Sequence, residues 1–176
     1  YLFGLLFICL LWGCTKRQHP KNYVIGFSQC TGSDDWRKTM LDEMKRELSF
    51  HNNITFIYKN ANANSQKQIQ QIHELVDQHI DLLIVSPNEV DPLSPVIQKV
   101  YDSGLPVVVI DRRTNSNYTA FIGASNFEVG QNAGKYAAYI LKGHGNVMEV
   151  TGLPDASPVI ERHNSFMDII SQYPGI

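Results

Sequence analysis

Apolar and polar positions follow two periodicities that alternate regularly along the chain. Short runs rich in Val, Ile and aromatic residues are typical of buried strands, and these predicted strands cover residues 23–28, 54–58, 82–85, 107–110, 119–123 and 147–150. Between them, apolar residues three or four apart predict amphipathic helices, which begin near residues 35, 65, 91, 126 and 157. Ser65 and Asn126 are the expected N-caps of two of these helices. The regular alternation predicts an α/β fold with a doubly wound parallel sheet.

The end of the chain predicts a second structural unit. The strand at 147–150 stands between two predicted helices, and one strand cannot bury both faces of a second sheet. We therefore expect a complete N-terminal lobe over residues 21–124 and the start of a C-terminal lobe, cut short, over 125–176. The alternative is that all six strands form one complete sheet.

The first twenty residues differ in character from the rest. Leu2 to Trp12 is an uncharged apolar run, shorter than a membrane span, and polar residues follow Cys14. We interpret residues 1–20 as a secretion signal, lipoprotein leader or membrane anchor. The sequence Leu11-Trp12-Gly13-Cys14 resembles a bacterial lipobox, although Trp12 departs from its usual pattern, and the resemblance implies lipidation of Cys14. A buried hairpin is the competing interpretation.

Composition and charge indicate a globular protein and disfavour a nucleic-acid-binding one. The chain of 176 residues is 43% hydrophobic and 18% charged, which is typical of a globular protein. Its net charge is -2, and its Lys and Arg residues are scattered, so no basic face for nucleic acid is expected.

Candidate ligand-binding chemistry follows the most apolar strand. The run Val107 to Ile110 stops at Asp111-Arg112-Arg113, and in open parallel sheets ligands bind beyond the carboxyl ends of the strands. Asp111 can accept hydrogen bonds from two hydroxyls while Arg112 donates to a third, which suits a polyhydroxylated ligand. The alternative is a surface ion pair that caps the strand.

Signatures of catalysis are absent from the sequence. Gly143-His144-Gly145 lacks the Lys-Ser/Thr of a phosphate-binding loop, and there is no Gly-x-Ser-x-Gly elbow. The six His residues are dispersed, and we interpret Cys30 as a packed thiol at a strand end. We therefore predict no metal, no cofactor and no enzymatic activity for these residues.

Four segments together resemble a known family. They are Val24-Ile25-Gly26-Phe27-Ser28-Gln29 with Asp34-Asp35-Trp36-Arg37, then Asp81-Leu82-Leu83-Ile84-Val85-Ser86-Pro87, then Val107-Val108-Val109-Ile110-Asp111-Arg112, and finally Ile122-Gly123-Ala124-Ser125-Asn126 leading to Glu149-Val150-Thr151-Gly152 and Glu161-Arg162-His163. Their order from Tyr23 to Ile176 resembles the ribose-binding-like branch of the type I periplasmic binding proteins. The resemblance implies two lobes that close over one small ligand, usually a sugar.

The resemblance also implies which residues bind. They are Ser28, Gln29, Asp35, Trp36, Asp111, Arg112 and Arg162. An indole such as that of Trp36 covers the apolar face of a sugar ring, while Arg162 is implied to come from the second lobe. Three alternatives remain open: Trp36 as a core residue, Asp35 as an acid that favours the helix dipole, and Arg162 as a solvated helix residue.

A narrower resemblance concerns cellular role. The acidic, Trp-bearing loop and the pair Gln29-Cys30 are similar to sensor domains of hybrid two-component systems in gut Bacteroidetes, which implies a membrane-anchored periplasmic protein of a Gram-negative bacterium with a histidine kinase module as partner. The alternative is a lipoprotein that delivers sugar to the permease of an ABC transporter. A repressor of the related class is disfavoured, because the apolar leader stands where its DNA-reading helices would be.

Overall fold

The computed structural model describes residues 21–176, so the predicted leader and Cys14 lie outside the described residues. Five parallel strands form one sheet in the order β2-β1-β3-β4-β5. The strands are β1 (Tyr23–Gln29), β2 (Ile54–Asn60), β3 (Leu82–Ser86), β4 (Val107–Ile110) and β5 (Ala120–Ile122). This confirms the predicted α/β fold with a parallel sheet.

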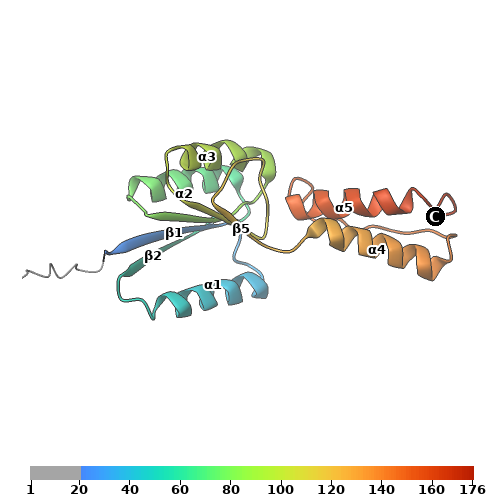
Figure 1. The fold of residues 1–176 in the computed structure, drawn as a ribbon, viewed down its shortest axis with the longest axis horizontal. Coiled ribbons are helices and arrows are strands. Elements are labelled where there is room, and N and C mark those ends of the chain that lie inside the picture. Colours follow the sequence, from blue (N-terminus) through green and yellow to red (C-terminus); the bar gives the residue numbers. More distant parts are fainter. Residues whose placement is uncertain (1–20) are drawn as a thin grey trace, which may run out of the picture.

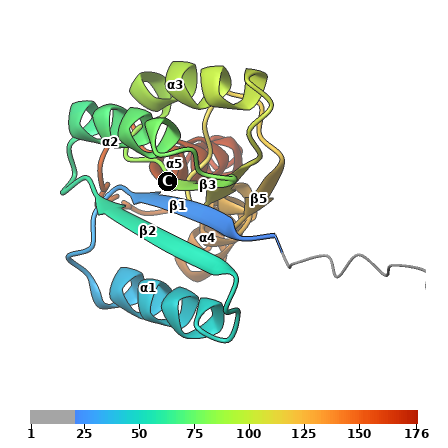
Figure 2. The same ribbon diagram turned by 90° about the vertical axis from the view of Figure 1, so that its left-hand side faces the viewer.

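Helices cover both faces of the sheet. Helix α1 (Asp35–Leu48) lies on one face, and helices α2 (Ser65–Asp77) and α3 (Val90–Asp102) lie on the other, as Figures 1 and 2 show. A helix follows each of β1, β2 and β3 and returns the chain to the start of the next strand, while residues 111–119 do so between β4 and β5. All neighbouring strands are parallel, so they end at the same edge of the sheet. That edge positions the candidate site.

The main hydrophobic core lies between the sheet and helices α2 and α3. Its buried members are Ile72, Leu75, Ile80, Leu83, Val85, Leu93, Val96, Ile97, Val100, Val107 and Val109. Gly26 of β1 lets α2 approach, because a Cβ at that position would lie 3.0 Å from Ile80 Cδ1 and 3.1 Å from Leu75 Cδ2. The core therefore fixes β1, β3 and β4, whose carboxyl ends bear most of the predicted site residues.

Helices α4 (Asn126–Leu141) and α5 (Ser157–Ile170) pack against each other beyond the carboxyl ends of the strands (Figure 1). The strand predicted at 147–150 is wrong: these residues form no regular secondary structure, and Met148 and Val150 are both 89% exposed. A strand needs a neighbour for its backbone hydrogen bonds, and within residues 21–176 no strand lies beside this segment. The alternative of one six-stranded sheet is contradicted as well.

Two helix N-caps lie one residue earlier than predicted. The side chain of Asn64 accepts from Lys67 N at 2.8 Å, and that of Ser125 accepts from Glu128 N at 3.3 Å. Ser65 and Asn126 are therefore the first residues of their helices. Within residues 21–176 no helix has both the length and the apolar character that crossing a bilayer requires.

Candidate functional site

The end of β4 turns sharply into the candidate site. Asp111 has a φ of 66°, in the left-handed region that few residues other than glycine adopt, although Asp and Asn tolerate it best. Its backbone N–H donates to Ile122 O at 2.8 Å, and Arg112 N donates to Ile110 O at 2.7 Å. These bonds hold a strained turn in place, so the strand end presents the Asp111 and Arg112 side chains in fixed directions.

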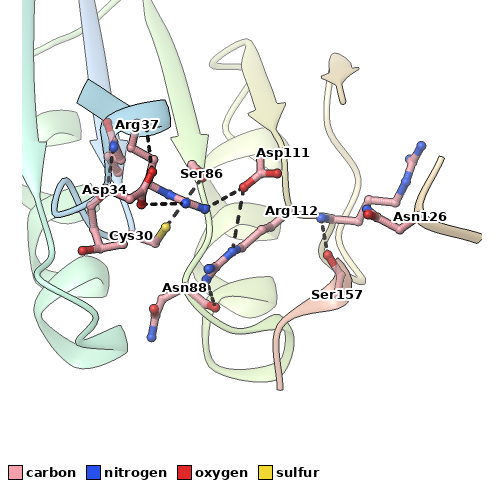
Figure 3. A network of polar contacts seen from close by, with 12 residues as sticks. Cys30, Asp34, Arg37, Ser86, Asn88, Asp111, Arg112, Asn126 and Ser157 are labelled. Atoms are coloured by element: carbon pink, nitrogen blue, oxygen red, sulfur yellow. Dashed lines mark hydrogen bonds and ion pairs between the residues drawn. The ribbon is translucent and has the colours of Figure 1, made fainter. Parts of the chain in front are cut away.

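A second arginine reaches Asp111 from helix α1. Asp34 caps this helix by accepting from Arg37 N at 2.9 Å, and its other carboxylate oxygen accepts from Arg37 Nη1 at 3.0 Å. Arg37 Nη2 donates to Asp111 Oδ2 at 2.7 Å (Figure 3). The guanidinium thus joins the first turn of α1 to the end of β4, across 74 residues of sequence.

This ion-pair network shifts the pKa values of its members. Desolvation alone would raise the pKa of Asp34, but the hydrogen bonds from the Arg37 backbone and guanidinium outweigh it, so the pKa of Asp34 lies below its usual value. Burial acts to lower the pKa of Arg37, but the interactions with Cys30, Asp34 and Asp111 outweigh it, so the pKa of Arg37 lies above its usual value. Arg37 is therefore a permanent cation whose side chain is only 12% exposed.

Arg112 is fixed from the opposite side. Its Nη1 donates to Asn88 O at 2.7 Å, and its Nε lies 3.9 Å from Asp111 Oδ2 (Figure 3). The Asp111 carboxylate consequently lies between two guanidinium groups, yet 26% of its side chain is exposed. A carboxylate has about four acceptor positions, so Asp111 keeps capacity for a ligand.

These side chains line one pocket together with residues near the start of α5. The pocket has a volume of about 380 Å³ and is lined by Trp36, Arg37, Asp111, Arg112, Gly152, Leu153, Ala156, Pro158, Val159 and Arg162. Arg162 of α5 donates from Nε to Asn126 Oδ1 at 2.9 Å, which holds its side chain against the start of α4. The volume falls in the range of small-molecule sites. The structure therefore brings four of the seven residues implied to bind, Trp36, Asp111, Arg112 and Arg162, to one pocket.

The indole of Trp36 is available to a ligand. The residue is 56% exposed, which contradicts the alternative that it is a core residue. The Arg37 guanidinium carbon lies 5.4 Å from the centre of its ring, a cation–π contact that favours one orientation of the indole. One aromatic face thus borders the same pocket as the charged groups.

Three predicted residues do not line this pocket. Asp35 has a side chain that is 99% exposed and pairs with Lys38 at 3.2 Å. Ser28 and Gln29 are completely buried, and Gln29 Nε2 donates to Thr31 O at 2.6 Å instead of facing the pocket. Both residues belong to an inner strand, where Gln29 pairs with Asn60 of β2 and Ser86 of β3.

Arg37 is the site residue that the sequence analysis missed. Its spacing of three residues from Asp34 was the available signal, because residues so spaced are neighbours on a helix. Such a pair usually indicates only a surface ion pair. The contact with Asp111 is what makes Arg37 part of the site, and no local pattern predicts that contact.

The arrangement suits binding through hydrogen bonds and stacking. Cys30 is completely buried, as predicted, and its Sγ lies 3.8 Å from Ser86 Oγ, so it offers no exposed nucleophile. Across residues 21–176 no group of three or more His, Cys, Asp or Glu side chains is placed to hold a metal. The pocket instead offers guanidinium donors, one carboxylate acceptor and an indole face.

Comparisons with known proteins give a consistent result. A family model described as a periplasmic binding protein domain matches residues 25–176. The ribose import binding protein of Bacillus subtilis (strain 168) is 28% identical over 155 residues, which cover 88% of this chain and 50% of that protein. The galactofuranose-binding protein of Escherichia coli (strain K12) is 27% identical over 157 residues, covering 86% of this chain and 49% of that protein.

Solved structures agree in fold. The fructose-binding periplasmic domain of a hybrid two-component system superposes with a TM-score of 0.83 at 42% identity, covering 88% of this chain and 52% of that one. A solute-binding protein of an ABC transporter from Bacillus halodurans C-125, with bound myo-inositol, gives 0.82 at 25% identity, covering 90% and 55%. The chain therefore spans about half the length of these relatives.

Proposed function

The chain belongs to the family of periplasmic binding protein domains, and from that premise we propose that it binds a monosaccharide of the ribose or fructose type in the pocket between β4, α1 and α5. One observation carries the proposal: Trp36, Asp111, Arg112 and Arg162, from three separate parts of the chain, line a single pocket. Relatives described as binding ribose, galactofuranose and fructose support it.

The chemistry of the pocket matches a small sugar. The C–H face of a furanose or pyranose ring is apolar, so it packs against an indole such as that of Trp36. The hydroxyls at the rim of the ring are both donors and acceptors. Asp111 accepts from them, and the guanidinium groups of Arg112 and Arg162 donate to them.

We further propose that the sugar bridges two lobes, residues 21–124 and a second lobe that begins near residue 125. Asp111, Arg112 and Trp36 bind from the first lobe, while Arg162 binds from the second. A ligand that contacts both lobes stabilises the arrangement in which they are close, so affinity and lobe closure are thermodynamically linked.

A binding measurement on the full-length protein tests the site. Asn tolerates the left-handed backbone at position 111, so Asp111→Asn removes the charge while it keeps the turn. We expect affinity for ribose or fructose, measured by calorimetry, to fall at least about tenfold, because a hydrogen bond to a charged group is lost. The matched control is Asp35→Asn, which alters an exposed carboxylate outside the pocket. Unchanged affinity in Asp111→Asn would reject the proposed site.

As its role we propose the sensor domain of a membrane hybrid histidine kinase, located in the periplasm of a Gram-negative bacterium and anchored through the leader or a lipid on Cys14. The 42% identity to the sensor-type domain, against 25% to the transporter-type protein, favours this role. The second candidate is the binding lipoprotein of a sugar ABC transporter, which the relative described as an import protein supports.

Deletion of the gene separates the two roles. Loss of sugar-dependent transcription with normal uptake of labelled sugar supports the sensor, whereas loss of uptake supports the transporter. Metabolic labelling with a fatty acid, compared between wild type and Cys14→Ala, tests the lipid anchor. Equal labelling of the two proteins contradicts lipidation of Cys14.

A further inference from the structure

A buried glutamine outside the pocket is connected to Arg112 through one loop residue. Gln68 lies in α2, is completely buried, and does not line the pocket. Its Oε1 accepts from Asn88 N at 2.8 Å, and its Nε2 donates to Ser86 O at 2.9 Å and to Ser28 O at 3.4 Å. Both ends of the amide are therefore used to hold the chain where β3 ends.

Asn88 connects Gln68 to the site through hydrogen bonds. The residue is 3% exposed and lies between β3 and α3, outside any regular element. Its carbonyl oxygen accepts from Arg112 Nη1 at 2.7 Å, and its side-chain Nδ2 donates to Ser65 Oγ at 3.0 Å. Gln68 thus holds the backbone N–H of Asn88, and Ser65 holds its side chain. The carbonyl of the same residue accepts the hydrogen bond from Arg112.

The bond to Asn88 is the shortest polar contact that fixes the Arg112 guanidinium. The distance from Arg112 Nε to Asp111 Oδ2 is longer, at 3.9 Å. The carbonyl of a loop residue keeps its direction only when its neighbours in the chain are held. A binding group also needs supporting hydrogen bonds to stay in its productive geometry.

We propose that Gln68 is a positioning residue for the ligand: through Asn88 it sets the place of the Arg112 guanidinium in the pocket. The inference rests on the proposed function, because it assigns Gln68 a part in sugar affinity. The helix α2 thereby contributes to binding although none of its residues lines the pocket.

A neighbouring glutamine provides a matched control. Gln71 is also on α2 and only 8% exposed, and its Nε2 donates to Asn60 O at 2.9 Å, at the other edge of β1. Gln71→Met therefore removes a second buried amide of α2, one that makes a single side-chain hydrogen bond and has no link to Asn88. Gln68→Met and Gln71→Met are both expected to lower thermal stability, so stability alone cannot separate a positioning role from a structural one.

Sugar affinity in a double-mutant cycle separates them. We expect Gln68→Met to weaken calorimetric affinity of the full-length protein for ribose or fructose by about five- to tenfold, and Gln71→Met to leave it unchanged. In an Arg112→Met background, Gln68→Met should cause no further loss, because the group it positions is gone. Equal losses in both backgrounds, or unchanged affinity in Gln68→Met, would overturn the proposal.

A measurement without ligand keeps this inference separate from the proposed function. The NMR order parameter of the Arg112 Nε–Hε group should fall in Gln68→Met and stay at its wild-type value in Gln71→Met. If wild type binds no sugar, the proposed function fails, and this readout still decides whether Gln68 positions Arg112. If Gln68→Met does not fold, Ser65→Ala loosens Asn88 from its other side, and the same fall in order is expected; an unchanged value contradicts the proposal.

Discussion

At the scale of single residues, the site depends on charges that are already paired before a ligand arrives. The guanidinium of Arg37 contacts both Asp34 and Asp111, so it balances one capping carboxylate and one carboxylate of the pocket. Paired charges keep their positions better than free ones, because each fixes the other's rotamer. The indole of Trp36 is held less tightly and remains 56% exposed.

The stacking role of Trp36 can be tested by truncation. Trp36→Ala should weaken sugar affinity by about three- to tenfold, the range expected for loss of one aromatic contact, while Trp36→Phe should retain most of the affinity. Stability should change little, because the side chain is largely solvent-exposed. Phe50→Ala, at an aromatic residue that is 72% exposed and outside the pocket, is the control. Calorimetry that shows equal affinity in Trp36→Ala would contradict stacking.

The lowered pKa of Asp34 predicts a pH-dependent contribution to stability. A carboxyl group whose pKa is lower in the folded than in the unfolded state stabilises the fold above the unfolded value, ordinarily 3.8, and loses that contribution as pH falls through its folded pKa. Asp34→Asn keeps a good N-cap and removes only the charge. Its melting temperature should lie below that of wild type at neutral pH, and the difference should shrink as the pH falls below about 4.

Thermal unfolding followed by circular dichroism between neutral pH and about pH 3 measures this difference. Asp35→Asn is the matched control, because that carboxylate is 99% exposed and contacts only Lys38. It should change the melting temperature less than Asp34→Asn at neutral pH. A constant difference between Asp34→Asn and wild type across the whole range would rule out the charge contribution.

At the scale of elements, the sequence predicted β3 and β4 well because their continuous apolar runs are largely buried within the sheet. It also placed Asp111 at the end of β4, since a charged residue directly after Val107–Ile110 marks where burial stops. The segment 147–150 has three apolar residues around Glu149 but forms no strand, because a strand also requires a paired neighbour, which a local pattern cannot supply.

The same limit explains why some predicted residues lie outside the pocket while Arg37 lines it. Ser28 and Gln29 follow the apolar part of β1, as Asp111 follows β4, yet they are completely buried between β2 and β3. Arg37 looks like an ordinary helix residue until the fold brings it to Asp111. Which polar strand ends face the pocket is thus decided by loops and by long-range contacts, and the sequence pattern contains neither.

The pairing of α4 with α5 depends on two glycines. A Cβ at Gly130 would lie 2.0 Å from Ser165 Oγ and 2.3 Å from the carbonyl oxygen of Arg162, and one at Gly134 would lie 2.8 Å from Ile169 Cβ. The backbone of α5 cannot yield to such contacts without moving. Close approach of the two helices therefore requires glycine at both positions.

Gly130→Ala reverses the usual effect of alanine in a helix. Propensity alone would stabilise the helix by about 1 kcal/mol, but overpacking costs typically about 1–3 kcal/mol, and here one clashing atom is backbone. We expect a net loss of about 1–2 kcal/mol in the free energy of unfolding, measured by urea denaturation, and weaker sugar affinity because Arg162 shifts. Asn132→Ala, on the exposed face of α4, is the control and should be neutral or stabilising. A stabilised Gly130→Ala variant would refute this packing.

At the scale of the whole molecule, the sheet and the α5 region meet through a small set of backbone contacts. Arg113 N donates to Ser157 Oγ at 2.6 Å, and Val90 N donates to Asp155 O at 3.0 Å. A cavity of about 310 Å³ lies at this junction and is lined by residues from both sides. The junction is therefore incompletely packed, and these two hydrogen bonds are among the contacts that hold α5 against the ends of the strands.

Ser157 is placed to couple this junction to ligand affinity. Its hydroxyl accepts from Arg113 N only when α5 lies against the end of β4, and it lines the 310 Å³ cavity rather than the proposed sugar pocket. Ser157→Ala removes that bond without changing any group that touches the ligand. A ligand that bridges the two sides must then supply more of the free energy that holds them together, so its apparent affinity falls.

We expect Ser157→Ala to weaken sugar affinity by about three- to tenfold, since a typical hydrogen bond contributes about 0.5–1.5 kcal/mol. The change should appear mainly as faster dissociation in stopped-flow measurements, because the bond forms only after the two sides meet. Ser94→Ala is the matched control: Ser94 Oγ accepts from Asn115 N at 2.9 Å, but both residues belong to the sheet side of the junction. If the two variants dissociate at the same rate, Ser157 has no special part in closure, and the link between α5 docking and affinity must depend on the pocket residues alone.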